Sequence, residues 1–121
     1  MIVAIVGASS NQRKFGNKAL RAFRHAGHTV IPINPHETAI EGERAYASVL
    51  DYDGDIDEAT VYVPPHIGLK VIEEIAQKKI RTVWLNPGAD GDAVVKRAKE
   101  LGLKTRVACS IIGVGESPAA Y

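Results

Sequence analysis

One stretch near the N-terminus, an apolar run that ends in small residues, constrains the fold of this chain most. Ile2–Val6 contains four Ile or Val residues and passes directly into Gly7-Ala8-Ser9-Ser10. Such a run is typical of a strand that is buried on both faces. A helical period follows, in Ala19, Leu20, Ala22, Phe23 and Ala26. A strand, a small-residue loop and a helix in this order direct backbone N–H groups and a helix N-terminus toward a phosphate.

Size and composition indicate one ordinary globular domain, spanning residues 1–121. The chain is 45% hydrophobic and 24% charged, and no apolar run approaches the ~20 residues of a membrane span. Fifteen basic and fourteen acidic residues leave a net charge of +1, so no global field favours nucleic acid or membrane. The lone Cys109 excludes an internal disulfide, and we expect a cytoplasmic protein. The four scattered histidines predict no metal site.

Strand-like and helix-like segments alternate along the chain. The patterns predict strands at residues 2–6, 28–33, 59–63, 82–85 and 104–108, and helices at 17–25, 67–76 and 93–101. Residues 37–57 have a weaker pattern, and we expect a connection across the sheet with one short helix. The alternation predicts an α/β, Rossmann-like three-layer sandwich with a five-stranded parallel sheet in the order 3-2-1-4-5.

In such a sheet, ligands bind beyond the carboxyl ends of the strands, where the strand order reverses. Four segments are predicted to meet there: Gly7-Ala8-Ser9-Ser10, Asn34-Pro35-His36, Val63-Pro64-Pro65 and Asn86-Pro87-Gly88. Their small, rigid or amide-bearing residues favour the floor of a binding groove over a catalytic array.

A nicotinamide dinucleotide is the first ligand to test. The glycine fingerprint of that class is absent, because Ser9 stands at its second glycine position and Asn11 and Gln12 follow where its third is expected, and no acid directly ends the second strand. The loop instead offers two hydroxyls and an amide beside Arg13 and Lys14. These groups suit a pyrophosphate. A purely structural alternative, in which Ser9 caps the turn and Arg13 is solvated, stays open.

Four segments together resemble the small stand-alone CoA-binding proteins, which are similar to the N-terminal CoA-binding domain of the succinyl-CoA synthetase alpha subunit. The segments are residues 3–10, 30–35, 61–65 and 82–85. The resemblance implies that the first loop lines the CoA diphosphate and that residues 34–36 lie near the adenosine. It also implies that residues 63–64 lie against the adenine or pantetheine and residues 85–87 along the pantetheine arm. The implied CoA or acyl-CoA site comprises Gly7, Ala8, Ser9, Ser10, Asn11, Gln12, Arg13, Lys14, Asn34, Pro35, His36, Val63, Pro64, Leu85, Asn86 and Pro87.

One position departs from the synthetase-like pattern. That pattern places a lysine shortly after the proline that matches Pro35, and this chain has Glu37 there. An acid is a poor neighbour for a CoA phosphate, so the choice of ligand depends on whether His36 or Arg13 compensates.

Catalytic groups are sparse in the sequence. His66 follows two prolines at the predicted rim and is the best candidate for a general base, but no acid is placed to orient it. Cys109 follows the last strand and is either a small buried hydrophobe or a partner for the CoA thiol in a mixed disulfide. We expect a non-catalytic CoA sensor, carrier or regulatory module, monomeric or a small homo-oligomer. The alternatives are a small NADP- or nucleotide-dependent enzyme that uses His66 and Ser9, and a scaffold with a vestigial groove.

Overall fold

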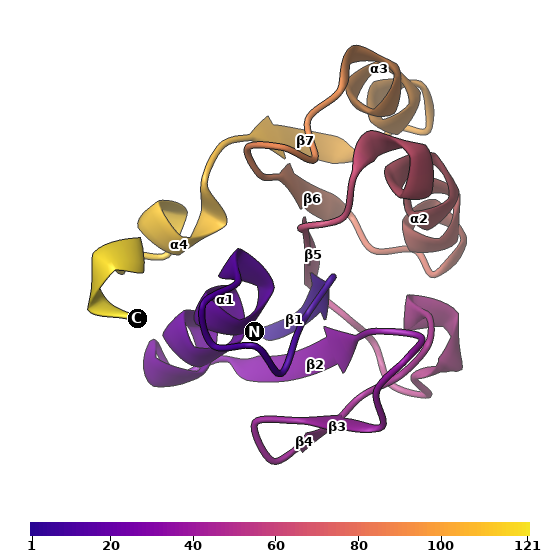
Figure 1. Ribbon diagram of the computed structural model, residues 1–121. Coiled ribbons are helices and arrows are strands. Elements are labelled where there is room, and N and C mark those ends of the chain that lie inside the picture. The colour runs from indigo at the N-terminus through magenta and orange to yellow at the C-terminus, as the bar shows by residue number, and fades with distance from the viewer.

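A computed structural model describes residues 1–121 and has helices on both faces of one parallel sheet (Figure 1). Five strands form this sheet: β1 (Ile2–Val6), β2 (Thr29–Ile33), β5 (Glu58–Val61), β6 (Thr82–Leu85) and β7 (Lys104–Val107). The main helices are α1 (Phe15–His25), α2 (Pro65–Gln77) and α3 (Asp92–Glu100). The chain ends with α4 (Ser110–Gly113) and a single turn, η2 (Pro118–Ala120). The predicted Rossmann-like α/β class is confirmed. None of the helices has the length and apolar character needed to cross a membrane.

The strands lie in the order β2-β1-β5-β6-β7. Numbered along the chain, these five strands read 2-1-3-4-5. The segment predicted at 59–63 therefore lies beside β1 and not outside β2. Tyr46 takes the outer position through an isolated parallel bridge to Ile33. If this bridge is counted as the third strand, the sheet follows the predicted 3-2-1-4-5 pattern. In either numbering the order reverses between β1 and β5.

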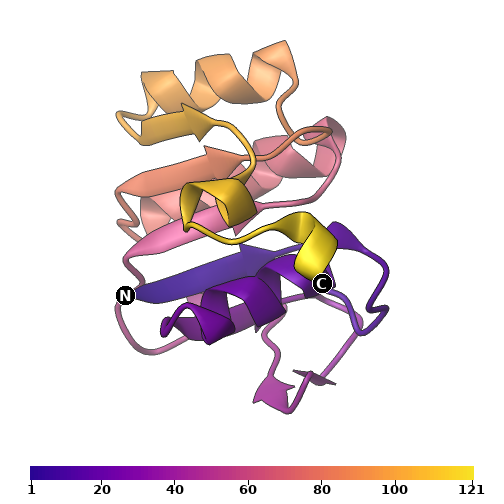
Figure 2. The same cartoon turned by 90° about the vertical axis from the view of Figure 1, so that its left-hand side faces the viewer.

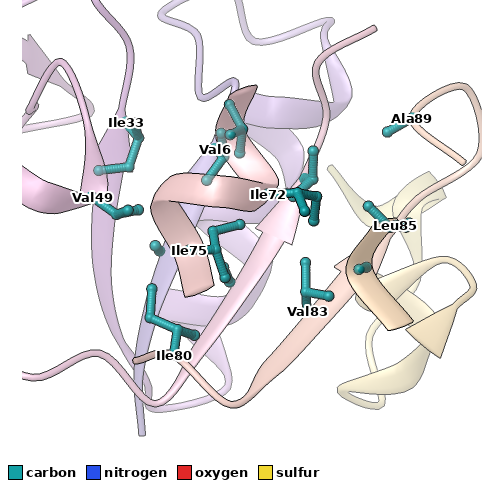
Figure 3. Close-up of a cluster of buried hydrophobic side chains, with 14 of the residues drawn as sticks. Val6, Ile33, Val49, Ile72, Ile75, Ile80, Val83, Leu85 and Ala89 are labelled. Atoms are coloured by element: carbon teal, nitrogen blue, oxygen red, sulfur yellow. The ribbon is translucent and has the colours of Figure 1, made fainter. Parts of the chain in front are cut away.

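The alternating side chains of β1 fill the core on both faces of the sheet. Val3 and Ile5 pack against Leu20 and Phe23 of α1, and all four are at most 2% exposed. Ala4 and Val6 belong to the cluster under α2 and α3. Figure 3 shows Ile72 and Ile75 of α2 lying among sheet residues of that cluster. Burying each large aliphatic side chain contributes roughly 1.5–3 kcal/mol, so the run in β1 anchors both layers.

The connection between β2 and β5 is a small hairpin followed by one helical turn. The hairpin pairs β3 (Ala39–Ile40) with β4 (Glu43–Arg44), and the turn is η1 (Val49–Asp51). Ser48 caps η1, because its Oγ accepts from the N–H of Leu50 at 3.1 Å. The predicted short helix is thus present as η1, and Val49 is buried in the core cluster beside α2.

A buried polar network joins the end of β6 to α4. Asn86 is 1% exposed, and its amide nitrogen donates to Thr60 Oγ1 at 2.7 Å and to the carbonyl of Val61 at 3.0 Å. Its amide oxygen accepts from the N–H of Ser110 at 2.8 Å. Ser110 Oγ in turn contacts Thr60 Oγ1 at 2.7 Å and Tyr62 OH at 2.9 Å. Because each member has its partners, the network fixes the C-terminal segment on the α1 side of the sheet (Figure 2).

Candidate functional site

Side chains from the surrounding elements hold the loop between β1 and α1 by donating hydrogen bonds to its carbonyl oxygens. The amide of Asn34 donates to the carbonyl of Ala8 at 2.8 Å, and the amide of Asn17 donates to the carbonyl of Ser9 at 2.8 Å. Arg21 donates to the carbonyl of Gln12 at 3.0 Å. In a trans peptide the N–H points away from the C=O. Holding the carbonyl of Ala8 against Asn34 therefore turns the N–H of Ser9, which follows it, away from that contact.

Four N–H groups of this region donate no hydrogen bond within the chain. They belong to Ser9 and Gln12 in the loop and to Phe15 and Gly16 in the first turn of α1. Lys14, the residue before the helix, makes no side-chain cap, and the first turn carries no acidic residue. The partial positive charge of an uncapped helix N-terminus and free amides together suit an anion.

Two hollows meet at the carboxyl ends of β1 and β5. The loop hollow measures 500 Å³ and lies around the first loop and the start of α1. The α2 hollow measures 420 Å³, is mainly apolar, and lies between the end of β2, η1 and α2. Both are lined by Gly7, Asn34 and Val63, so they lie next to each other where the strand order reverses. This position matches the predicted ligand site.

Two carboxylates lie against the first loop. Glu37 accepts from the backbone N–H of Ser10 at 3.1 Å and from the amide of Asn34 at 3.3 Å. Glu41, in the turn of the β3–β4 hairpin, accepts from the side-chain amides of Asn17 at 3.2 Å and Gln12 at 3.3 Å. The hydrogen bond from Asn17 is the main cause that holds the pKa of Glu41 below its usual value. Glu41 thus stabilises the loop by accepting from side chains, whereas Glu37 accepts from a backbone N–H of the loop.

Most residues of the predicted site line the two hollows. The residues that do so are Gly7, Ala8, Ser9, Lys14, Asn34, Pro35, His36, Val63, Pro64 and Pro87. Ser10, Asn11, Gln12 and Arg13 lie in the exposed outer part of the loop and line neither hollow. Leu85 and Asn86 are buried at 0% and 1% exposure. Their side chains belong to the core and to the polar network, so the structure does not bring them to the site.

Helix α2 contributes one wall of the α2 hollow, which the sequence patterns did not predict. Ile67, Lys70, Val71 and Glu74 line the α2 hollow from that helix. Ile67 is 43% exposed although it is apolar. Its place in the helical period suggested only core packing, and which turn of α2 faces a cavity depends on how the helix crosses the sheet. Phe15 and Gly16, which also line the loop hollow, were missed because α1 begins two residues earlier than predicted.

Of the groups considered for chemistry, only Ser9 lines a hollow. His66 is exposed on the first turn of α2 and lines neither hollow. Ser9 Oγ accepts from the N–H of Asn11 at 3.0 Å, as in the structural alternative. Cys109 is half-buried next to α4 and packs beside the cluster under α1. No group of three or more His, Cys, Asp or Glu side chains is arranged to hold a metal ion.

Comparison with known proteins identifies relatives of the same architecture. An acetate–CoA ligase (ADP-forming) from Archaeoglobus fulgidus is 31% identical over 98 residues, which cover 81% of this chain and 14% of the ligase. The chain thus corresponds to a small part of that enzyme. A conserved hypothetical protein from Pyrococcus furiosus has 31% identity and a TM-score of 0.83, covering 93% of this chain and 97% of its own.

A further solved structure is an acetyl-coenzyme A synthetase from Ca. Korarchaeum cryptofilum. It superposes with a TM-score of 0.75 and 27% identity, covering 86% of this chain and 25% of the synthetase. The model of the CoA binding domain family matches residues 2–114, nearly the whole chain. The small loop after β1, the adjacent hollows and this match agree with the resemblance drawn from the sequence. The chain therefore belongs to the CoA binding domain family.

Proposed function

We propose that this chain binds CoA or an acyl-CoA across the two hollows and performs no chemistry of its own. The observation that carries the proposal is the set of free N–H groups from Ser9, Phe15 and Gly16 around the loop hollow. Amides at a helix N-terminus hold a diphosphate without further charge, and Lys14 beside them adds a cation. The diphosphate would lie there.

The two ends of the ligand would then extend into different surroundings. The α2 hollow offers apolar walls and the amide of Asn34, which suits an adenosine. The loop hollow continues past Pro64 and Pro87, whose apolar, rigid surfaces suit a pantetheine arm. The family match and the ligase relatives support CoA as the ligand.

The absence of chemistry is part of the proposal. The ligase activity named for the Archaeoglobus relative belongs to an enzyme of which the match covers 14%. Ser9 Oγ is engaged in a turn and His66 lies outside the hollows, which weakens the case for an enzyme that uses them. Binding of CoA without catalysis suits a sensor, a carrier or a regulatory module.

Isothermal titration with CoA, acetyl-CoA, NADP and ATP tests the proposal. We expect saturable binding of CoA and acetyl-CoA, with the acyl-CoA recovered unchanged after incubation. Binding of NADP alone would favour a nucleotide-dependent enzyme. Binding of none of the four would favour a scaffold with a vestigial groove.

A further inference from the structure

Glu37 lies at the point where the first loop meets the end of β2. Its carboxylate accepts from the N–H of Ser10 at 3.1 Å, so a negative group already occupies one backbone donor of the loop. The same carboxylate contacts the amide of Asn34 at 3.3 Å, and Asn34 lines both hollows. The chain thus places an anion beside the junction through which a ligand spanning both hollows must pass.

The position of this carboxylate is set by a local turn. Asn34 Oδ1 accepts from the N–H of His36 at 2.7 Å, which folds the chain back directly after β2. The turn brings Glu37 toward the first loop although it is 27 residues away in sequence. An acid at the end of the second strand that faces the first loop is the arrangement by which Rossmann-type domains hold the ribose hydroxyls of an adenosine.

We propose that Glu37 is a specificity-determining residue that disfavours a phosphate on the ribose of the bound adenosine. This inference rests on the proposed function, because it assumes an adenosine in the α2 hollow and a diphosphate at the loop hollow. Free ribose hydroxyls can donate to the carboxylate. A ribose 3′-phosphate, as in CoA, places a second anion beside it and cannot donate in the same way.

The neighbouring cations do not neutralise Glu37. No ion pair joins it to Arg, Lys or His. Its hydrogen-bond donors are the neutral N–H of Ser10 and the neutral amide of Asn34. Glu41, by comparison, contacts the side-chain amides of Asn17 and Gln12 and does not use a backbone donor of the loop. The carboxylate of Glu37 is therefore an unpaired negative group against the first loop, whereas Glu74, the carboxylate that lines the α2 hollow, lies on α2.

The test compares CoA with dephospho-CoA, which lacks only the ribose 3′-phosphate. Titration of the wild-type chain should show tighter binding of dephospho-CoA. In Glu37→Gln, which keeps an oxygen acceptor for Ser10, we expect CoA to bind roughly tenfold tighter, because a like-charge repulsion at close range is removed. Dephospho-CoA should bind equally well or more weakly, because a charge-assisted hydrogen bond becomes a neutral one. The ratio of the two affinities is the decisive quantity.

Glu100→Gln is the matched control. Glu100 ends α3, and its side chain is 50% exposed. Glu37 follows β2, at the far end of the sheet from α3 (Figure 1). The substitution changes the net charge by the same amount, so it should leave the ratio of affinities within about twofold of wild type. A similar change in Glu37→Gln and Glu100→Gln would overturn the proposal, and so would an unchanged ratio in Glu37→Gln.

The titrations distinguish the role of Glu37 from the binding of CoA itself. If the wild-type chain binds CoA or dephospho-CoA but Glu37→Gln leaves their ratio unchanged, only the role of Glu37 is refuted. If none of the three proteins binds either compound at millimolar concentration, the proposed function fails and this inference fails with it.

Discussion

The backbone of Gly16, at the start of α1, lies directly against the carbonyl oxygen of Gly7, which follows β1. The approach is so close that a Cβ on Gly16 would collide with this oxygen. Gly16 is buried in the first turn of the helix. Only a residue without a side chain lets the helix N-terminus approach the strand this closely. This contact brings the free N–H groups of Phe15 and Gly16 to the loop hollow.

The first prediction concerns that close approach. Gly16→Ala should lower the free energy of unfolding by at least ~2 kcal/mol, because backbone on both sides of the contact must shift. Gly68→Ala is the matched control within a helix, since a Cβ there would lie 3.4 Å from Val94 in ordinary contact. That control should be neutral, or stabilising by up to ~1 kcal/mol, because alanine favours helix. Urea denaturation measures both, and equal effects would contradict the assignment.

The second prediction tests the free N–H of Phe15. Phe15→Pro removes this donor at the first position of α1, where proline is tolerated. Lys14 before it has φ −80° and ψ 146°, an extended conformation that proline permits in its neighbour. Phe15→Ala removes the same ring, which is largely exposed, but keeps the N–H. We expect Phe15→Pro to bind CoA roughly tenfold more weakly than Phe15→Ala, because a hydrogen bond to a charged phosphate is lost.

Isothermal titration of both Phe15 variants checks this expectation. Their circular dichroism spectra should match that of the wild-type chain, because the substituted N–H makes no bond within the fold. Equal CoA affinities in two folded variants would mean that the diphosphate does not use this helix N-terminus.

The third prediction concerns the buried amide of Asn86. Asn86→Ala leaves the N–H of Ser110 without a partner in the interior and removes the amide that donates to the hydroxyl of Thr60, which keeps only its contact with Ser110 Oγ. Unsatisfied buried polar groups are costly, so we expect the free energy of unfolding to fall by ~2–4 kcal/mol. Asn11→Ala, in the exposed loop, removes only an acceptor for the N–H of Arg13 and should cost less than ~1 kcal/mol. Thermal and urea unfolding report both values, and a similar cost at the two positions would refute the structural role of the network.

The fourth prediction concerns alkaline pH. Burial raises the pKa of the Tyr62 hydroxyl to about 12, above its ordinary value of 10.0. The folded state therefore keeps a proton that the unfolded state releases, so its contribution to stability is complete below pH 10 and declines as the pH rises toward 12. Tyr62→Phe cannot titrate, and at neutral pH it loses the hydrogen bond to Ser110. Its deficit relative to wild type should accordingly shrink between pH 10 and 12.

Unfolding measured at several alkaline pH values for the wild-type chain and Tyr62→Phe checks this sign. Tyr46→Phe is the control, because it leaves Tyr62 in place and should keep the same pH-dependent decline as the wild-type chain. A deficit of Tyr62→Phe that stays constant from pH 8 to pH 12 would show that the hydroxyl is not held in its protonated form by burial.

Much of the fold follows from local patterns. The β-branched run in β1 predicts a central strand, and the structure confirms one with two faces in the core. The segment at 82–85 forms β6 with the predicted bounds. Such patterns are readable because strand and helix periods are properties of neighbouring residues. The composition of the loop at Ser9 also predicts an anion site, which stays a prediction that the free N–H groups support.

Positions that depend on contacts distant in sequence needed the tertiary structure. The family resemblance implied a place for Asn86 along the pantetheine arm, yet its hydrogen bond with Ser110, 24 residues on, holds its side chain in the interior. Tyr46, in a weakly patterned segment, takes the outer edge of β2. Lys70 reaches the α2 hollow through the packing of its helix.

By itself, the sequence determined the class of the domain and pointed to the loop that we expect to face a phosphate, because local hydrophobic periods and small residues carry that information. The tertiary structure decided which donors of the loop stay free and which carboxylate lies against them. The contact between Glu37 and Ser10 illustrates the difference, since it spans 27 residues and depends on the turn after β2. Side-chain partners of this kind are set by how the elements pack, which a local pattern does not encode.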